Sequence, residues 1–291
     1  MRLLVTGGSG FLGWHVLREA ARRGHETVAL ARSPAAARVV AACGARPLPG
    51  DLDHARGLDE AFTTGRCDTL LSLTSLALGH GPAIVAAAED AGIRRAVFVS
   101  TTAVTTALCP PTKQVRLAAE RQIRASGLDW TILRPTMIYG APGDRNLSRL
   151  LTLLSRARVL PVPGGQCLHQ PVHVADVAGA VLAAAVRPAA IGSRYDVAGP
   201  EPLPFAELLR ISACTVGSST RFVPVPLAPM VTLARGYERL SRRPRIRAEQ
   251  VRRLGEDKAF AIDEAARDLG YAPRPFPEGI RDEARALGLT V

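Results

Sequence analysis

The sequence predicts an α/β fold, a doubly wound parallel sheet with a second, smaller lobe at the C-terminal end. Three observations carry this prediction. Short apolar runs alternate with helical stretches of about ten residues over the first 135 residues, a glycine-rich turn follows the first apolar run, and prolines and glycines then end the alternation. Alternating strands and helices form right-handed crossovers between parallel strands, which gives a sheet covered by helices on both faces.

The elements follow from the spacing of apolar residues. Strands are expected over residues 2–6, 26–31, 68–73, 95–100 and 130–133, where short runs are almost wholly apolar. Helices are expected over residues 14–23, 34–43, 58–62, 82–91 and 115–126. The first helix should end at Gly24, because glycine is the commonest residue just past a helix C-terminus.

The alternation of strands and helices ends after Pro135, and the segments 140–143 and 161–165 are rich in glycine and proline. We expect residues 1–165 to form the nucleotide-binding domain and residues 199–291 the smaller substrate lobe. Residues 172–198 should pack back on the first domain, because residues 177–186 form an Ala/Val-rich helix. No internal repeat of fixed period is present, which argues against a solenoid.

Composition narrows the function classes. The chain has 37 Lys and Arg against 26 Asp and Glu, but only Lys113 and Lys258 are lysines, so the charge reflects an arginine bias along the whole chain. With 4% aromatic residues and no reader motif, nucleic-acid binding is not expected. The five cysteines form no C-x-x-C or Cys/His cluster, so neither a disulfide framework nor a metal site is expected.

No leader or membrane span is expected either. The apolar run that begins at Met1 is broken by glycine at residue 7, and no stretch reaches about 18 uninterrupted apolar residues. A cytoplasmic protein is therefore the expectation.

The most informative segment is Val-Thr-Gly-Gly-Ser-Gly-Phe-Leu-Gly at residues 5–13, between the first strand and the first helix. Gly7 permits a tight turn, Gly10 lets the backbone approach a pyrophosphate, and Gly13 allows close packing of helix on strand. The helix N-terminus adds free N–H groups and a positive dipole end. This is the Rossmann arrangement for dinucleotides, and Ser9, Phe11 and Leu12 complete the predicted cradle.

The end of the second strand indicates which dinucleotide binds. An acidic residue there hydrogen-bonds the ribose 2′-hydroxyl and selects NAD(H). This chain has Arg32 and Ser33 instead, and a guanidinium can pair with a 2′-phosphate while the serine adds a hydrogen bond. The sequence therefore favours NADP(H) over NAD(H).

With its turn at residues 6–13, the chain resembles the extended and atypical short-chain dehydrogenase/reductases (SDRs), the epimerase/dehydratase-like group that includes a complex I subunit-like branch. Further matches follow in order at residues 50–52, 97–102, 131–140, 171–177 and 268–273. The resemblance implies that Asp51 and Leu52 lie near the adenine and that Leu73 and Thr74 line the cofactor cleft. It also implies that Arg134 and Pro135 pass near the nicotinamide.

The resemblance also implies a catalytic Tyr-x-x-x-Lys pair with a nearby Ser or Thr that polarises the substrate oxygen. Thr102 resembles that hydroxyl. The pair itself is missing, because none of the four tyrosines has a lysine four residues later. Alignment on the helix puts Thr112 at the tyrosine position and Arg116 at the lysine position, and neither is a good proton donor.

Several other groups remain candidates for the proton donor. One register pairs Cys109 with Lys113, although prolines 110 and 111 disfavour a helix there. Tyr139, His80, His169, a water molecule and the substrate itself are the alternatives. A structural role is expected for His173 and Asp176, which recur in the family in a segment that closes the fold.

Two further features bear on the substrate. Nucleotide-sugar enzymes that resemble this chain carry an arginine where it has His169, which argues against a nucleotide sugar. Residues 235–253 hold eight arginines after an apolar, proline-rich run. We interpret this stretch as a solvated helical face, with a lid over an anionic or lipidic substrate or a contact with a membrane surface as alternatives.

The sequence thus predicts an NADP(H)-dependent oxidoreductase that acts on a small or apolar carbonyl or enone. One alternative is a catalytically silent NADP(H)-binding protein that senses redox state or assists an assembly, and a third hypothesis is a nucleotide-sugar epimerase or dehydratase. A small-molecule substrate is the expected partner, whereas the oligomeric state is not predicted.

Overall fold

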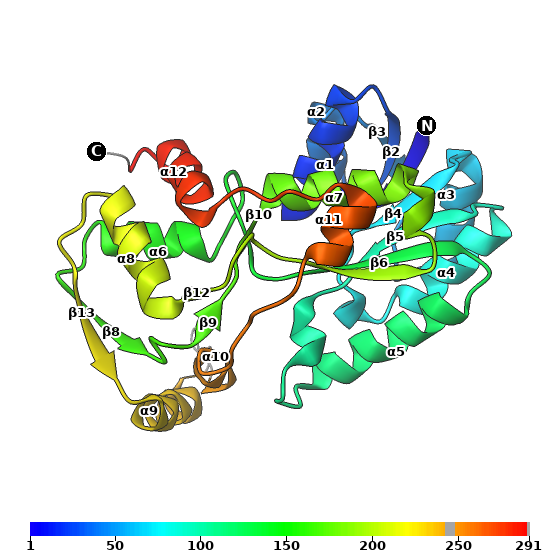
Figure 1. Cartoon of the computed structure of the whole chain (residues 1–291). Coiled ribbons are helices and arrows are strands. Elements are labelled where there is room, and N and C mark those ends of the chain that lie inside the picture. The colour runs from blue at the N-terminus through cyan, green and yellow to red at the C-terminus, as the bar shows by residue number, and fades with distance from the viewer. Residues whose placement is uncertain (242–247, 290–291) are drawn as a thin grey trace.

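A seven-stranded parallel sheet forms the centre of the first domain (Figure 1). The structure, a computed structural model, describes residues 1–241 and 248–289, without the side chains of residues 55–57. The strand order is β11-β6-β5-β4-β1-β2-β3, so the chain runs outward from β1 in both directions. The strands are β1 (Arg2–Thr6), β2 (Glu26–Ala31), β3 (Arg46–Pro49), β4 (Thr69–Ser72), β5 (Arg95–Val99), β6 (Asp129–Pro135) and β11 (Ser193–Val197). The predicted doubly wound Rossmann fold is confirmed.

Helices cover both faces of this sheet. One apolar core joins the sheet to α1 (Phe11–Arg22), α2 (Pro34–Ala42), α7 (Val174–Val186) and α11 (Asp263–Leu269). The core on the opposite face joins it to α3 (Ala55–Gly65), α4 (Gly81–Asp90) and α5 (Pro111–Ala125). Burial of apolar side chains on both faces explains why the strands read as continuous apolar runs.

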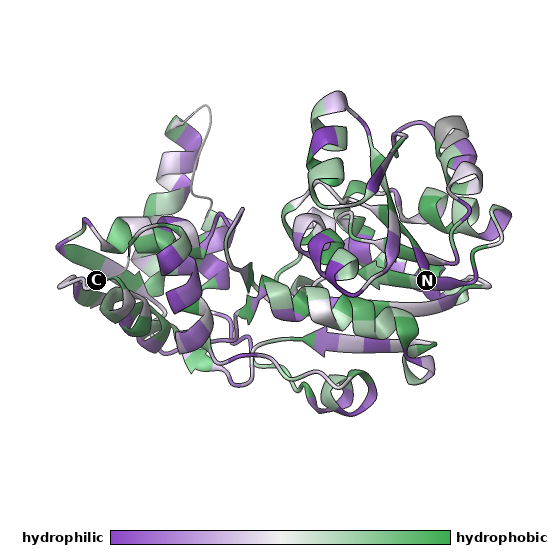
Figure 2. Ribbon diagram, turned by 90° about the horizontal axis from the view of Figure 1, so that it is seen from above, coloured by the Kyte–Doolittle hydropathy of each residue, from purple (hydrophilic) through white to green (hydrophobic). Residues whose placement is uncertain are grey.

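Helix α7 packs on the sheet of the first domain, in contact with α1. Most of this helix is hydrophobic in Figure 2, as expected for a helix that its neighbours and the sheet cover. It begins three residues before the expected residue 177, at Val174, since the Nδ1 atom of His173 accepts a hydrogen bond from the Ala175 N–H at 3.3 Å and caps the helix.

The sequence analysis missed two strands of the sheet, β3 and β11. Both are edge strands, each paired with a single neighbour. Two of the four residues of β3 are prolines, Pro47 and Pro49, which donate no hydrogen bond and are tolerated at a sheet edge. In β11, charged and polar residues alternate with Tyr195 and Val197, so the strand carries no continuous apolar run.

The second lobe has its own apolar core, built from α6 (Leu147–Leu154), α8 (Phe205–Thr215) and α12 (Phe276–Ala286). A parallel pair of strands, β8 (Val159–Pro163) and β13 (Arg221–Val225), leads into α9 (Leu227–Leu240) and α10 (Ala248–Arg253). Short pairs, β7 (Ile138–Tyr139) with β10 (Val172–His173) and β9 (Leu168–His169) with β12 (Leu203–Pro204), lie between the lobes. Three 3-10 turns complete the described elements: η1 (Leu76–Leu78), η2 (Thr102–Thr105) and η3 (Pro188–Ala190).

The packing favours a discontinuous division of the chain, and the boundary at residue 165 stays a prediction. Helix α6, which precedes that boundary, packs with α8 and α12 in the second lobe. Helix α11, which follows it, packs on the first domain. We therefore propose that the chain passes between the two parts more than once. None of the helices in the described residues is long and apolar enough to cross a membrane.

A buried carboxyl group in α12 makes the stability of this lobe depend on pH. Glu283 is 1% exposed, and burial, with a smaller contribution from Asp144, raises its pKa from 4.5 to about 8. The folded state therefore holds this proton more tightly than the unfolded state, so stability should fall as the pH rises from 4.5 to about 8. We expect Glu283→Gln to raise the melting temperature at pH 8 to 9 and to change it little near pH 5.

The control is Glu278→Gln, a substitution of an exposed glutamate in the same helix. Thermal unfolding of the three proteins across this pH range measures the effect. If Glu283→Gln and Glu278→Gln show the same dependence on pH as the parent protein, the buried carboxyl group is not the cause.

Candidate functional site: a dinucleotide cavity beside an interlobe cavity

The glycine-rich turn connects β1 to α1 at the carboxyl edge of the sheet. Gly7 has a positive φ of 74°, and a Cβ atom there would lie 3.0 Å from the Thr74 backbone nitrogen. Gly10 precedes the first turn of α1, and its N–H donates to the Gly7 carbonyl oxygen at 3.0 Å. Gly13 lies against the turn, where a Cβ atom would be 2.1 Å from the Gly7 oxygen. Only glycine therefore brings the N-terminus of α1 this close to β1.

A cavity of about 310 Å³ opens beside this turn, at the ends of β1, β2 and β4. It brings together eight of the residues that the sequence assigned to the cofactor: Gly7, Ser9, Gly10, Arg32, Asp51, Leu52, Leu73 and Thr74. Thr6, Leu30, Asp53, Leu78 and His80 also line it. His80 lies 3.6 Å from Asp53 here, in the dinucleotide cavity rather than beside Thr102.

The donor set of this cavity fits a nicotinamide dinucleotide. The first-turn N–H groups of α1 lack partners within the helix and suit a pyrophosphate. The Asp51 carboxylate and the apolar side chains of Leu52 and Leu73 suit an adenosine, and the exposed Arg32 suits a phosphate on its ribose. At Gly7 and Gly13, the space that a Cβ atom would need is taken up by neighbouring atoms of the protein, most of them backbone, so the turn stays close to β1 and β4.

The other residues predicted for the cofactor have different surroundings. Leu12 is buried in the first core, and Phe11 contacts the ring of His15 at a centroid distance of 5.6 Å. The Ser33 hydroxyl oxygen accepts the Ala36 N–H at 3.2 Å, so this residue caps α2. Neither Ser33 nor Phe11 lines the dinucleotide cavity, and their part in cofactor binding stays a prediction.

Arg134, which was expected near the nicotinamide, has a partner inside the protein. Its side chain is 7% exposed and turns into the protein, where its Nε and Nη2 atoms donate to the carboxylate of Glu120 on α5. Ser100 also donates to this carboxylate, at 2.6 Å. Pro135 is buried as well, and its carbonyl oxygen accepts from Thr102 at 3.4 Å. The Arg134 side chain therefore fixes α5 on the sheet, and the passage of Arg134 and Pro135 near the nicotinamide stays a prediction.

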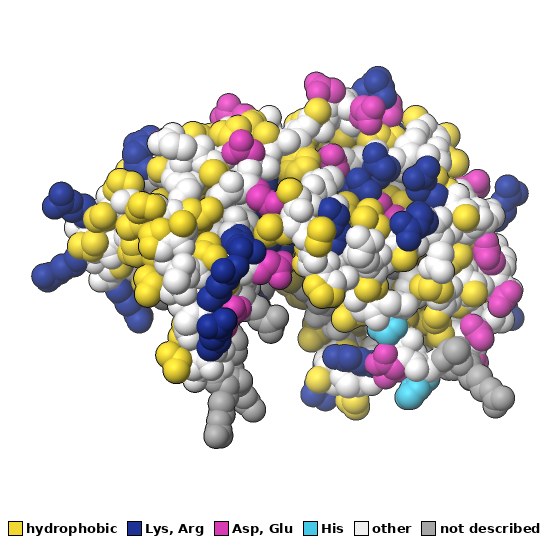
Figure 3. All heavy atoms as spheres, turned by 90° about the horizontal axis from the view of Figure 1, so that it is seen from below, with side chains coloured by type: hydrophobic (Ala, Val, Ile, Leu, Met, Phe, Trp, Pro, Cys, Tyr) yellow, Lys and Arg dark blue, Asp and Glu magenta, His cyan; other side chains and the backbone are white. Residues whose placement is uncertain are grey.

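Two adjoining cavities, of about 340 and 360 Å³, lie where the second lobe faces Thr102. Thr102, Ala103, Arg253 and Lys258 line both of them. Most other lining side chains of the larger one are uncharged, among them Met137, Pro171, Phe205 and Leu254. In the space-filling view from below, a groove separates the two parts of the molecule, with both basic and acidic side chains on its rim (Figure 3).

Thr112 and Arg116 lie on the first turns of α5, which begins four residues before the expected helix. Arg116 Nη1 donates to Thr112 Oγ1 at 3.1 Å, so the two side chains touch as the Tyr-x-x-x-Lys spacing requires. Burial, and then the charge of Arg253, lowers the pKa of Arg116, but a guanidinium remains a poor proton donor. Cys109 precedes the helix, which begins at Pro111, so the alternative pairing of Cys109 with Lys113 on one helix is wrong.

Tyr139, another predicted candidate for the proton donor, is enclosed by the protein. It is 1% exposed and packs edge-on against His173 and Phe276. Burial raises its pKa, and its hydroxyl lies against Gly279, where a Cβ atom would be only 2.2 Å away. The tyrosine therefore holds α12 against the strand pair between the lobes.

The two polar residues predicted to be structural have partners. His173 caps α7, and burial lowers its pKa to about 4. Asp176 accepts hydrogen bonds from the backbone and the guanidinium of Arg274. Both contacts close the fold between α7 and the C-terminal segment.

The sequence analysis missed residues that the second lobe brings to Thr102. Arg253 is the last residue of α10, and Lys258 lies in the segment after that helix. Gln170 comes from the segment after β9. Their only sequence signal was that Lys258 is one of two lysines in the chain. The predicted basic stretch 235–253 contributes Arg253 to the cavities, whereas its residues 242–247 lie outside the described residues.

Comparison with known proteins shows which family has this fold and this cavity. A family model described as NAD(P)H-binding matches residues 7–188, which is more than half of the chain. The chain belongs to the NAD(P)H-binding family. It shares its fold with solved epimerases and dehydratases, and it is an NAD(P)H-binding oxidoreductase.

Several named relatives of this NAD(P)H-binding protein are reductases, and it is also 24% identical to a photosystem II assembly factor of Synechocystis over 78% of this chain. It is 31% identical to a 4-hydroxy-2-methyl-3-oxo-4-farnesyl-3,4-dihydroquinoline-1-oxide ketoreductase of Stigmatella aurantiaca, over 99% of this chain and 97% of that one. It is 28% identical to a 2-alkyl-3-oxoalkanoate reductase of Stenotrophomonas maltophilia, over 97% and 98% of the two chains. Among solved structures, the UDP-glucose 4-epimerase of Thermus thermophilus with NAD shares the fold, with a TM-score of 0.75, 22% identity and 100% coverage of both chains.

Proposed function

We propose that this protein reduces a carbonyl or enone that bears small or apolar groups, with NADP(H) as the cofactor. The observation that carries the proposal is the arrangement of cavities along one edge of the sheet. One cavity has the donor set for a dinucleotide, and the next is lined by Thr102 among mainly uncharged side chains. A bound reduced nicotinamide would supply a hydride. The Thr102 hydroxyl, which donates to the Pro135 carbonyl oxygen at 3.4 Å in this structure, would turn its proton to the substrate oxygen.

The names of the relatives support this substrate class. The ketoreductase and the 2-alkyl-3-oxoalkanoate reductase are both named for ketones, and the substrate named for the first carries a farnesyl chain. The uncharged lining of the cavity, with Met137, Phe205 and Leu254, suits such apolar groups. His169, which stands in place of a phosphate-binding arginine, disfavours a nucleotide sugar: burial and the charge of Lys258 lower its pKa to about 4, so it is neutral at pH 7.

The test is NADPH oxidation by the purified protein with a panel of aliphatic ketones, enones and quinones, and with UDP-glucose. We expect turnover of at least one apolar carbonyl compound and none of the sugar nucleotide. In the variant Thr102→Ala, kcat should fall, whereas Thr152→Ala, which removes an exposed threonine hydroxyl on α6, should leave it unchanged. Tight NADPH binding without turnover across the panel would overturn the proposal in favour of a silent binding protein.

The cofactor preference rests on Arg32, the one basic residue that lines the dinucleotide cavity within the described part of the chain, apart from His80. A charge-assisted hydrogen bond contributes about 1.5–3 kcal/mol, so Arg32→Ala should weaken NADPH binding by roughly 10- to 100-fold. NADH, which has no 2′-phosphate, should bind nearly as before.

Titration of NADPH and NADH fluorescence gives both dissociation constants. Arg38→Ala on the same side of the domain is the control, because Arg38 does not line the cavity. Equal losses for the two nucleotides in Arg32→Ala would show that the guanidinium does not read the 2′-phosphate.

A further inference from the structure

The chain segment 256–260 crosses from the second lobe to the catalytic face of the first domain and is fixed at both sides. On the first domain, the Glu256 carboxylate accepts from Thr106 Oγ1, at 2.5 and 2.8 Å, and from the Ala107 N–H at 3.0 Å. On the second lobe, the Lys258 N–H donates to the Leu168 carbonyl at 2.8 Å. Lys258, in the middle of this segment, therefore has a defined position between the lobes.

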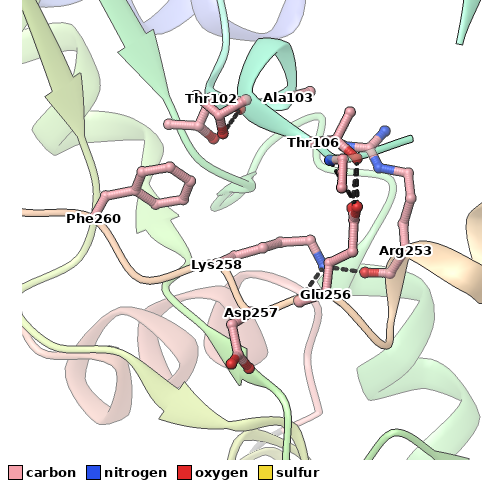
Figure 4. Close-up of a pocket in the computed structure, with 10 residues that line it drawn as sticks. Thr102, Ala103, Thr106, Arg253, Glu256, Asp257, Lys258 and Phe260 are labelled. Carbon is pink, nitrogen blue, oxygen red and sulfur yellow. Dashed lines mark hydrogen bonds between the residues drawn. The ribbon is translucent and has the colours of Figure 1, made fainter. Parts of the chain in front are cut away.

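The side chain of Lys258, which ends in an amine, lies along the cavity that Thr102 also lines (Figure 4). Two of its N–H groups donate to carbonyl oxygens, those of Arg253 and of Glu256, the latter at 3.4 Å. An ammonium group has three N–H donors. The third has no acceptor among the residues that the structure describes, so it is available to a ligand in the cavity.

We propose that Lys258 is the proton donor of the reaction, in place of the missing tyrosine. This inference rests on the proposed carbonyl reduction. Thr102 and Lys258 come from different lobes and line the same two cavities. The proposal places the carbonyl oxygen within reach of the Lys258 ammonium group, with the Thr102 hydroxyl turned from Pro135 to the same oxygen. The alternatives are weaker, because Tyr139 is buried, Arg116 holds its proton, and His169 is neutral.

The proposed step balances. A hydride adds to the carbonyl carbon, the C=O π bond breaks, and one N–H bond of Lys258 breaks as its proton forms the O–H bond of the alcohol. The amine is left neutral and takes up a proton from solvent before the next turnover. The reductant is the dinucleotide that the family binds, which leaves in its oxidised form.

The surroundings of the amine suit this cycle. Burial, and then the charge of Arg253, lowers the pKa of Lys258 to about 8. A general acid works best when its pKa is close to the operating pH, since it must both give up and regain a proton. The charged and titratable groups that face it are Arg253, Glu256, Asp257, Cys167 and His169.

A test that does not depend on turnover uses the scarcity of lysine in this chain. Lys113→Arg leaves Lys258 as the one lysine, so growth with ¹³C,¹⁵N-lysine labels it alone and leaves its amine unmodified. We expect the NMR signal of its Cε to titrate near pH 8 and to shift when NADP⁺ and a ketone are added together. A midpoint near the ordinary lysine pKa of 10.5, with no response to the ligands, would overturn the inference.

Kinetics then separate catalysis from structure. In Lys258→Arg, the guanidinium keeps the positive charge and the hydrogen bonds to the two carbonyls but does not release a proton. We expect an unchanged melting temperature and a kcat lower by roughly 10²- to 10⁴-fold. The parent enzyme should lose activity as the pH rises through about 8, because the acid must be protonated, and this fall should vanish in the variant.

The outcomes distinguish the two proposals. If the parent protein reduces a ketone and Lys258→Arg keeps both its kcat and its pH profile, the reductase function stands and the role of Lys258 is wrong. If the parent protein binds NADPH but reduces no carbonyl compound, the proposed function fails and the role of Lys258 falls with it. Lys258→Met, which removes the charge, should lose activity at every pH.

Discussion

Replacement of Gly13 by alanine should reduce the affinity for NADPH on the order of 100-fold and should also destabilise the fold. The new Cβ atom would lie 2.1 Å from the Gly7 carbonyl oxygen and 2.7 Å from the Gly8 Cα atom. Both are backbone atoms, so α1 must move away from β1. Overpacking of this kind costs about 1–3 kcal/mol, and a displacement of about 1 Å can itself cost about 100-fold in function.

Gly236→Ala is the matched control. Gly236 lies in α9 and is exposed, and a Cβ atom added there would meet no neighbouring element of the described chain within 4 Å. Alanine favours a helix over glycine by about 1 kcal/mol, so this variant should be as stable as the parent protein or slightly more so. Fluorescence titration with NADPH and urea unfolding measure the two effects. Normal NADPH affinity in Gly13→Ala would contradict the packing argument.

The second large effect is expected for the buried ion pair between Arg134 and Glu120. The two residues are 7% and 4% exposed. Arg134→Met leaves the Glu120 carboxylate buried without its cation, and the loss of one partner of a buried pair costs about 3–5 kcal/mol. The double variant with Glu120→Met removes both charges and should recover part of this loss.

An exposed pair provides the comparison. Arg210 and Glu207 lie on the surface of α8 at a distance of 2.5 Å, and a pair in contact with solvent contributes about 0–1 kcal/mol. Urea unfolding of Arg134→Met, the double variant and Arg210→Met gives the three free energies. A loss in Arg134→Met as small as that in Arg210→Met would show that the buried pair does not hold α5 on the sheet.

Much of the first domain was predictable, because its strands are buried on both faces and therefore read as apolar runs. The helices were placed within a few residues, and α3 and α5 proved longer than their apolar spacing indicated. Strand β3 was missed since its prolines resemble a loop, although an edge strand accepts them. The second lobe was not resolved into elements because its core is assembled from helices far apart in the sequence.

The dinucleotide cavity was largely predictable for a different reason. It is built from backbone that only glycine allows and from residues at strand ends, and the order of elements fixes both. Arg134 shows the limit of such inference: its place just after the expected strand 130–133 was clear, but the direction of its side chain depends on Glu120, a partner on another element. The position of Lys258 could not be inferred at all, because a long loop brings it to Thr102.

The last two helices have a consequence for how this protein can be cut or extended. Helix α11 belongs to the core that joins the sheet to α1 and α7, and α12 belongs to the core of the second lobe. Only residues 270–275 lie between the two helices. Neither lobe is thus complete until the final stretch of chain is present. A ribosome must release nearly the whole polypeptide before both cores can close, and a shortened version ending at residue 260 should be recovered as aggregate rather than as an independently folded nucleotide-binding fragment.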